Sequence, residues 1–131
     1  MRNTLHKSEI LRGYSVFSNI LKGGEFVQST GLRCYYKKKQ WEKGGTFVRA
    51  GFAVARKDVP LAVDRNKVKR LLREAFRHQK SGINEAAKKK NVEIDLVLVF
   101  KVLRGAEIRK IRYTAVEGAL TEVLAKIIST V

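Results

Sequence analysis

The stretch from Asp64 to Lys80, DRNKVKRLLREAFRHQK, holds seven lysine and arginine residues in seventeen positions. A helix advances about 100° per residue, so this stretch divides into an apolar face and a polar face. The apolar face contains Val68, Leu71, Leu72 and Ala75, with Phe76 at its edge. The polar face contains Asn66, Lys69, Arg70, Arg73 and Arg77, and Arg65 lies beside the apolar border. Since a guanidinium group can bind a phosphate through two hydrogen bonds, the polar face predicts contact with a polyanion.

A solvated helix face without any partner is the competing interpretation. Three features disfavour it. The polar face is mostly arginine, which is weakly hydrated, and it carries no acidic residue between the basic ones. Its members also repel one another at a spacing of four residues, as in Lys69 with Arg73 and Arg73 with Arg77. We therefore favour nucleic-acid contact for this helix.

The segment RAGFAVARK, from Arg49 to Lys57, supplies more basic residues next to the helix. Alternate residues of a strand share a face, which groups Arg49 with Gly51, while Arg56 and Lys57 close the segment. Phe17, Tyr35 and Tyr36 are candidates for stacking on the bases of a single strand. By the same alternation, Tyr35 and Tyr36 cannot both face the same side.

Catalytic residues are sparse. Glu93 and Asp95 form the one acidic pair of interest, at the spacing that places them on one face of a strand, and a solvated strand edge explains such a pair more simply. His6 and His78 are far apart in sequence and, with the single cysteine Cys34, cannot assemble a structural zinc site. Phosphodiester hydrolysis by protein groups would need clustered carboxylates or a histidine pair. The residues therefore indicate a binding protein.

The composition also indicates a polyanion as partner. Lys and Arg number 28 and Asp and Glu 12 in 131 residues, a net charge of +16. Such a charge destabilises the compact state until a polyanion relieves it, with nucleic acid as the first candidate and an anionic membrane surface as the second. No apolar run approaches the roughly 20 residues of a membrane helix, and no signal peptide is evident. We expect one cytoplasmic RNA-binding domain over residues 1–131.

The elements that would position these residues follow from periodicity and breakers. A first helix is expected over Ser8–Lys22, ended by Gly23 and Gly24. A second is expected over Asp64–Lys80, with Asp64 as its N-cap and Glu74 paired with Arg70. A third is expected over Tyr113–Ile128. Strands are expected over Phe26–Tyr36, Thr46–Ala55 and Ile94–Leu103, the last buried on both faces, and a short helix plus a loop over Lys80–Asn91. The order α-β-β-α-β-α predicts an α/β sandwich, with helices packed on one central sheet.

The stretch AVDRNKVKRLLREAFR resembles the arginine- and asparagine-rich motif of the bacterial ribonuclease P protein subunit, Ala-Val-x-Arg-Asn-x-x-Lys-Arg-x-x-Arg-x-x-Phe. The matching residues are Ala62, Val63, Arg65, Asn66, Lys69, Arg70, Arg73 and Phe76. Upstream, Arg49 and Gly51, followed by Val54 and then Arg56-Lys57, resemble the family's strand ending in Val-Ser-Lys-Lys. The resemblance covers most of the chain and implies a left-handed crossover in the sheet.

In that family an RNA subunit and its Mg²⁺ ions cut the 5′ leader from precursor tRNA, and the protein binds RNA. The resemblance implies contacts to the ribonuclease P RNA for Arg65, Asn66, Lys69, Arg70, Arg73 and Arg77. It implies a leader cleft containing Phe17, Tyr35, Arg49, Arg56 and Lys57. It implies no catalytic residue and no metal held by protein side chains alone, no membrane and no further protein partner. The chain departs from the family pattern at Leu21, Ala55, Lys67 and the turn Asp58–Leu61.

Two other functions stay open. A general RNA-binding or ribosomal protein would share the basic helix but would have no role at the 5′ end of tRNA. A metal-dependent nuclease would use Glu93 and Asp95. The first predicts similar affinity for unrelated structured RNAs, and the second predicts cleavage without an RNA subunit.

Overall fold

A four-stranded sheet forms the centre of the protein in the computed structural model, which describes residues 9–11, 13–29, 31–101 and 111–131. The strands are β1 (Glu25–Ser29), β2 (Leu32–Gln40), β3 (Val48–Val54) and β4 (Val92–Phe100), in the spatial order β1-β2-β4-β3. β3 runs parallel to β4, and the other pairs are antiparallel. Three helices complete the mixed α+β fold: α1 (Tyr14–Gly23), α2 (Ala62–Lys90) and α3 (Tyr113–Ile128).

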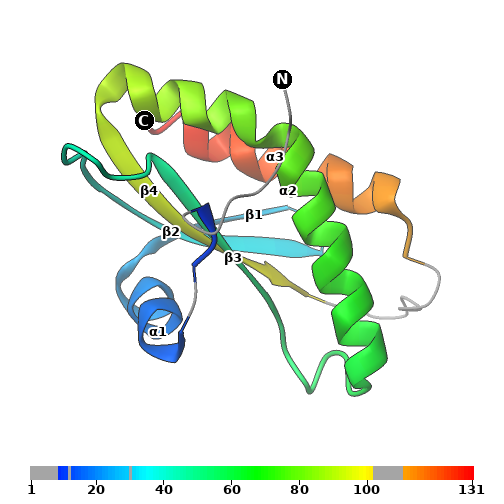
Figure 1. Ribbon diagram of the computed structural model, residues 1–131. Helices are drawn as coiled ribbons and strands as arrows, with labels where there is room; N and C mark the ends of the chain where they lie inside the picture. The colour runs from blue at the N-terminus through cyan, green and yellow to red at the C-terminus, as the bar shows by residue number, and fades with distance from the viewer. Residues whose placement is uncertain (1–8, 12, 30, 102–110) are drawn as a thin grey trace.

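The helices cover the two faces of the sheet unequally. α2 and α3 lie together on one face, and α1 lies on the other (Figure 1). Strand β4 serves both cores: Ile94, Leu96 and Leu98 pack toward α2 and α3, whereas Val97 and Val99 pack toward α1. This alternation confirms the prediction of a strand buried on both faces.

The strand faces also separate the two neighbouring tyrosines as predicted. Tyr36 is buried with α2 and α3, and Tyr35 packs with α1. Gly24 allows the close approach of α1 to β2, since a Cβ there would lie 2.7 Å from the carbonyl oxygen of Tyr36. Because Tyr35 packs with residues of α1, the sheet face under α1 is the one that carries Tyr35.

The predicted order of elements was wrong in one respect. The single strand expected over Phe26–Tyr36 is a hairpin, in which Ser29 of β1 pairs with Leu32 of β2. Gly31 has a φ of 76°, a left-handed conformation that glycine adopts without strain and that lets the chain reverse here. The order is consequently α-β-β-β-α-β-α.

Two helix boundaries also differ from prediction. α1 begins at Tyr14 instead of Ser8, because Ile10 forms a parallel bridge with Ala50 of β3 and Gly13 has a φ of 98°. α2 continues unbroken to Lys90, although a short helix and a loop were expected over Lys80–Asn91. Ile83 and Ala87 extend its buried stripe, and Asn91 ends it in the left-handed conformation.

The start of α2 differs as well. Its N-cap is Leu61, so Asp64 lies inside the first turn. The negative charge of Asp64 still interacts favourably with the positive end of the helix dipole there. α3 spans the predicted residues Tyr113–Ile128. Val102 and Leu103, at the end of the last predicted strand, lie outside the described residues, as does His6. The handedness of the β3-α2-β4 crossover stays a prediction. No helix in the described ranges is long and apolar enough to cross a membrane.

Candidate nucleic-acid interface

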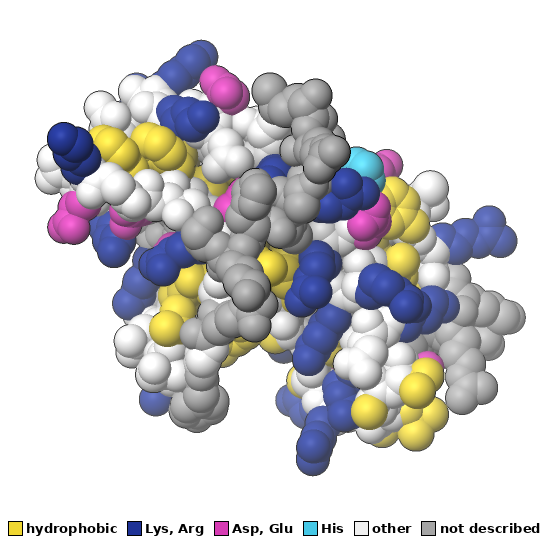
Figure 2. All heavy atoms as spheres, in the orientation of Figure 1, with side chains coloured by type: hydrophobic (Ala, Val, Ile, Leu, Met, Phe, Trp, Pro, Cys, Tyr) yellow, Lys and Arg dark blue, Asp and Glu magenta, His cyan; other side chains and the backbone are white. Residues whose placement is uncertain are grey.

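The N-terminal half of α2 separates into the two predicted faces. Val68, Leu72, Ala75 and Phe76 are buried in the core, and Leu71 is half-buried. On the other side Asn66, Arg70 and Arg73 are exposed, and Lys69 is half-exposed. Figure 2 shows Lys and Arg side chains gathered over this part of the molecule. We call the four polar residues the basic stripe.

Arg73 is positioned where α2 meets β3. Its guanidinium carbon lies 5.8 Å from the ring centroid of Phe52 in β3, a cation–π contact. Phe52 in turn packs edge-on against Phe76 of α2, with 6.1 Å between ring centroids. The buried aromatic pair therefore holds the charged end of Arg73 beside the sheet.

Arg65 has a structural contact that its position in the motif did not predict. Its Nη1 donates hydrogen bonds to the carbonyl oxygens of Val59, at 2.9 Å, and Pro60, at 2.7 Å. These bonds tie the β3–α2 loop to the first turn of α2. A contact of Arg65 with RNA would use the remaining donors of the guanidinium group.

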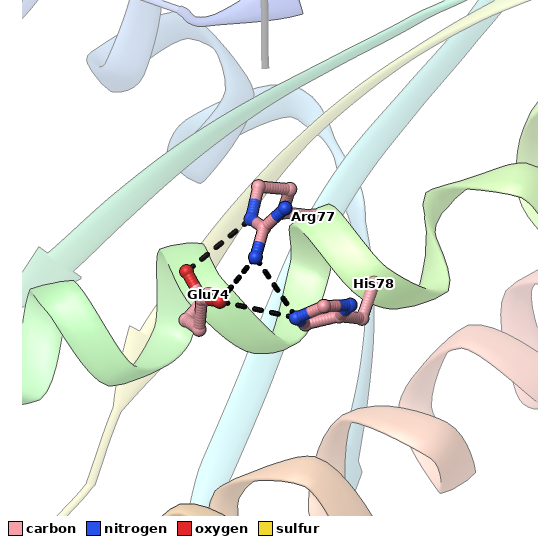
Figure 3. Close-up of polar contacts among 3 residues, drawn as sticks. All are labelled: Glu74, Arg77 and His78. Atoms are coloured by element: carbon pink, nitrogen blue, oxygen red, sulfur yellow. Dashed lines mark hydrogen bonds and ion pairs between the residues drawn. The ribbon is translucent and has the colours of Figure 1, made fainter. Parts of the chain in front are cut away.

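Arg77 lies at the far end of the stripe in a cluster with Glu74 and His78 (Figure 3). Arg77 donates two hydrogen bonds to the Glu74 carboxylate, and His78 Nε2 lies 3.0 Å from Glu74 Oε1. The hydrogen bonds from Arg77 lower the pKa of Glu74. The predicted pairing of Glu74 with Arg70 was therefore wrong, because Glu74 is directed toward the next turn of α2. In the part of the chain that the structure describes, a carboxylate offsets the charge of Arg77 and none is paired with Arg70.

The face of the sheet under α1 brings together Phe17, Tyr35 and Arg49. The Phe17 ring of α1 rests on Gly51 of β3, where a Cβ would lie 2.6 Å from its Cζ. Tyr35 packs on the same small core as Phe17. Glycine at position 51 thus provides the space that seats the ring. Arg56 and Lys57 are exposed in the loop that follows β3.

Each member of the acidic pair has a basic partner, Arg49 for Asp95 and Lys39 for Glu93. Arg49 donates hydrogen bonds of 2.9 and 2.7 Å to the two carboxylate oxygens of Asp95, and these bonds raise the pKa of Arg49. Glu93 is buried and lies 3.1 Å from the ammonium group of Lys39.

Burial raises the pKa of the Cys34 thiol, so Cys34 is a poor nucleophile.

The same contacts make the acidic pair a poor magnesium site. Mg²⁺ is held through carboxylates that are available to it, whereas Glu93 and Asp95 each have a basic partner. Within the described ranges no three His, Cys, Asp or Glu side chains are close enough to bind a metal ion. Glu93 and Asp95 are thus committed to ion pairs with Lys39 and Arg49.

A family model for ribonuclease P matches residues 5–128, nearly the whole chain. The chain belongs to the ribonuclease P protein family. It is 38% identical over 83 residues to the ribonuclease P protein component of Chlorobium phaeobacteroides, a match that covers 62% of this chain and 57% of that protein. It is 40% identical over 86 residues to the protein component of Chlorobaculum tepidum, covering 64% and 56% of the two chains. These matches span less than two thirds of either relative.

Solved structures of ribonuclease P proteins share the fold. The protein from Thermotoga maritima is 28% identical with a TM-score of 0.71, and the match covers 90% of this chain and 96% of that one. The Staphylococcus aureus protein is 24% identical with a TM-score of 0.67, covering 92% and 96%. The second similarity supports the fold alone.

Two residues of the α1 face were missed by sequence reasoning, Phe26 and Arg33. Phe26 lies directly opposite Tyr35 in the β1–β2 hairpin, and Arg33 donates a hydrogen bond to the Tyr35 hydroxyl. The signal that would have found them is the reversal of the chain at Gly31, which sets this register. Without the hairpin, Phe26 and Tyr35 belong to one strand and cannot contact each other.

Proposed function

We propose that this chain is the protein subunit of ribonuclease P, which binds the catalytic RNA and the 5′ leader of precursor tRNA. The observation that carries the proposal is the basic stripe, Asn66, Lys69, Arg70 and Arg73, on a helix whose opposite side is buried in the core. A rigid helix presents these side chains in a fixed pattern, and arginine suits the phosphates of a folded RNA. Family membership supports the choice of RNA.

The residues fall into two binding surfaces under this proposal. The basic stripe, with Arg65 and Arg77 at its ends, binds the RNA subunit. The leader lies on the α1 face, where Phe17 and Tyr35 offer aromatic rings and Arg56 and Lys57 offer positive charge. Arg49 lines the same face, with its charge offset by Asp95. Bases stack on aromatic rings whatever their identity, so this surface accepts leaders of varied sequence.

The chemistry belongs to the RNA subunit in this account. The RNA subunit would hold the Mg²⁺ ions, which in phosphoryl transfer would activate the nucleophile and stabilise the leaving oxygen. This chain contributes counter-charge that lets two RNAs approach, and it holds the leader in place. A cytoplasmic location follows from the substrate, and no other protein is required.

Replacing Gly51 with alanine is expected to weaken binding of leader-bearing precursor tRNA by about fivefold or more, since loss of one base–aromatic stack costs roughly 5- to 150-fold. The new Cβ would lie 2.6 Å from Cζ of Phe17 and displace the ring. The measurement compares the dissociation constants of precursor and mature tRNA for the protein assembled with a bacterial ribonuclease P RNA.

The matched control is Gly118→Ala in α3, where an added Cβ meets nothing within 4 Å. That variant should keep the wild-type preference for the leader. If the wild-type assembly binds precursor and mature tRNA equally, or binds unrelated structured RNAs as well as it binds tRNA precursors, the chain is a general RNA-binding protein and the proposed function is wrong. If the wild-type assembly prefers the leader and Gly51→Ala keeps the full preference, Phe17 is not a leader contact.

A further inference from the structure

Phe26 is the most exposed aromatic ring of the β1–β2 hairpin, with 54% of the residue surface accessible. It lies directly opposite Tyr35 across the two strands, and the ring centroids are 5.8 Å apart with an interplanar angle of 42°. Contact with Tyr35 accounts for one side of the ring. More than half of the residue stays open to solvent, so burial in the core does not explain a phenylalanine here.

Arg33 of β2 brings a positive charge to the same two rings. Its guanidinium carbon lies 5.1 Å from the ring centroid of Phe26 and 6.0 Å from that of Tyr35. Nη1 donates a 3.1 Å hydrogen bond to the Tyr35 hydroxyl, and Nη2 donates one of 3.1 Å to Oε1 of Gln28. Among the described residues both hydrogen-bond partners of Arg33 are uncharged, so the group is held in place while no carboxylate there offsets its charge.

The nearest acidic residue of the hairpin does not neutralise this charge. Glu25 pairs with Tyr36 in the register of the hairpin, and its carboxylate accepts a 2.9 Å hydrogen bond from the Tyr36 hydroxyl. Tyr36 belongs to the core under α2 and α3, on the opposite face of the sheet from Tyr35. The α1 face of the hairpin therefore combines an open aromatic ring with a fixed cation.

The register of the sheet places this group in line with the predicted leader contacts. Phe26, Tyr35, Val97 and Gly51 are successive partners across β1, β2, β4 and β3. The Phe17 ring rests on Gly51 at one end of this row, and Phe26 occupies the other end. Three strand spacings of about 4.8 Å separate the ends by about 14 Å, so the two ends can hold different nucleotides of one strand.

We propose that Phe26, Arg33 and Tyr35 form a second stacking site, which binds an unpaired nucleobase of the precursor-tRNA leader on the exposed ring of Phe26. Arg33 attracts the adjacent phosphate and contributes cation–π attraction to the stack. The inference rests on the proposed function, because it places a further part of the same leader on the same face. It extends that face to the β1 edge of the sheet.

The test uses Phe26→Leu, which keeps an apolar side chain without a ring, and Phe26→Tyr, which keeps the ring. Each full chain is assembled with a bacterial ribonuclease P RNA, and dissociation constants are measured for mature tRNA and for precursors with leaders of increasing length. Phe26→Leu should weaken binding of long-leader precursors by about 5- to 150-fold, the range for one base–aromatic stack. Phe26→Tyr should bind within about twofold of wild type, and mature tRNA should not distinguish the variants.

A second measurement reports stacking directly. 2-Aminopurine replaces one leader base at a time, and its fluorescence falls when it stacks on a ring. A base that stacks on Phe17 should be quenched by all three proteins. We expect one further position to be quenched by wild type and Phe26→Tyr, and to stay bright with Phe26→Leu. The wild-type part of this scan is informative even if the leucine variant does not fold, because fewer than two quenched positions would overturn the inference.

The outcomes separate the inference from the proposed function. If wild type prefers leader-bearing tRNA and Phe26→Leu keeps the full preference, the second stacking site is wrong and the proposed function stands. If Phe26→Leu and Phe26→Tyr weaken binding equally, the ring acts through packing alone and the site is also wrong. If wild type shows no preference for the leader, the proposed function fails and the inference fails with it.

Discussion

Replacing Leu72 with alanine is expected to lower the free energy of unfolding by about 2–5 kcal/mol, the range for a leucine truncated in a packed core. Leu72 is completely buried between α2 and the sheet. The lost side chain forfeits its burial and leaves a cavity that the neighbouring residues fill only in part. Urea denaturation followed by far-ultraviolet circular dichroism measures the change.

The matched control is Val63→Ala, in the same helix, where 77% of the valine surface is exposed. That substitution should change the free energy of unfolding by less than about 0.5 kcal/mol. Leu71 is half-buried, so Leu71→Ala should fall between the two. A loss below about 1 kcal/mol for Leu72→Ala would show that the apolar side of α2 does not anchor the helix as described.

Converting Lys69, Arg70 and Arg73 together to glutamine is expected to weaken binding to ribonuclease P RNA on the order of a hundredfold near physiological salt. Each phosphate contact contributes about 0.9 to the slope of log affinity against log salt, so three contacts lower its magnitude by about three. Over the range from about 1 M to 0.15 M salt, a decrease of this size in the slope removes roughly two decades of affinity for the RNA. Filter binding over a salt series measures both quantities.

The same helix supplies a control with an identical loss of charge. Lys88, Lys89 and Lys90 are exposed in its last turn, and about 19 residues at 1.5 Å each place them nearly 30 Å from Arg70. This separation exceeds the Debye length of about 8 Å, so their conversion to glutamine should leave most of the affinity intact. Equal losses in the two triple variants would mean that net charge, and not the basic stripe, determines binding.

Periodicity was sufficient where an element has one continuous buried stripe. α3 was predicted to the residue because Val116, Leu120, Val123, Leu124 and Ile127 recur at helical spacing, and all five are buried. The hairpin between β1 and β2 was missed because Gly31 is the turn signal inside a run that otherwise alternates as one strand. α2 was underestimated because its C-terminal half is mostly polar, and only Ile83 and Ala87 continue its buried side.

The candidate site, like the fold, could be predicted only in part. Which residues share the exposed side of α2 follows from a repeat of 3.6 residues, so the basic stripe could be predicted. The contacts of Arg65 with the β3–α2 loop, and of Arg49 with Asp95, depend on loop closure and on strand register. Residues 49 and 95 are brought together by parallel pairing across α2, which no local pattern specifies.

The most direct measurement of the proposed function is precursor-tRNA cleavage by a bacterial ribonuclease P RNA, with and without this chain, at a magnesium concentration too low for the RNA to act well alone. The account predicts that the chain restores cleavage at the mature 5′ end, and that the Lys69, Arg70 and Arg73 triple variant restores it only at much higher protein concentration. The chain without the RNA should not cleave. Cleavage that the chain does not stimulate, or cleavage by the chain alone, would contradict the account.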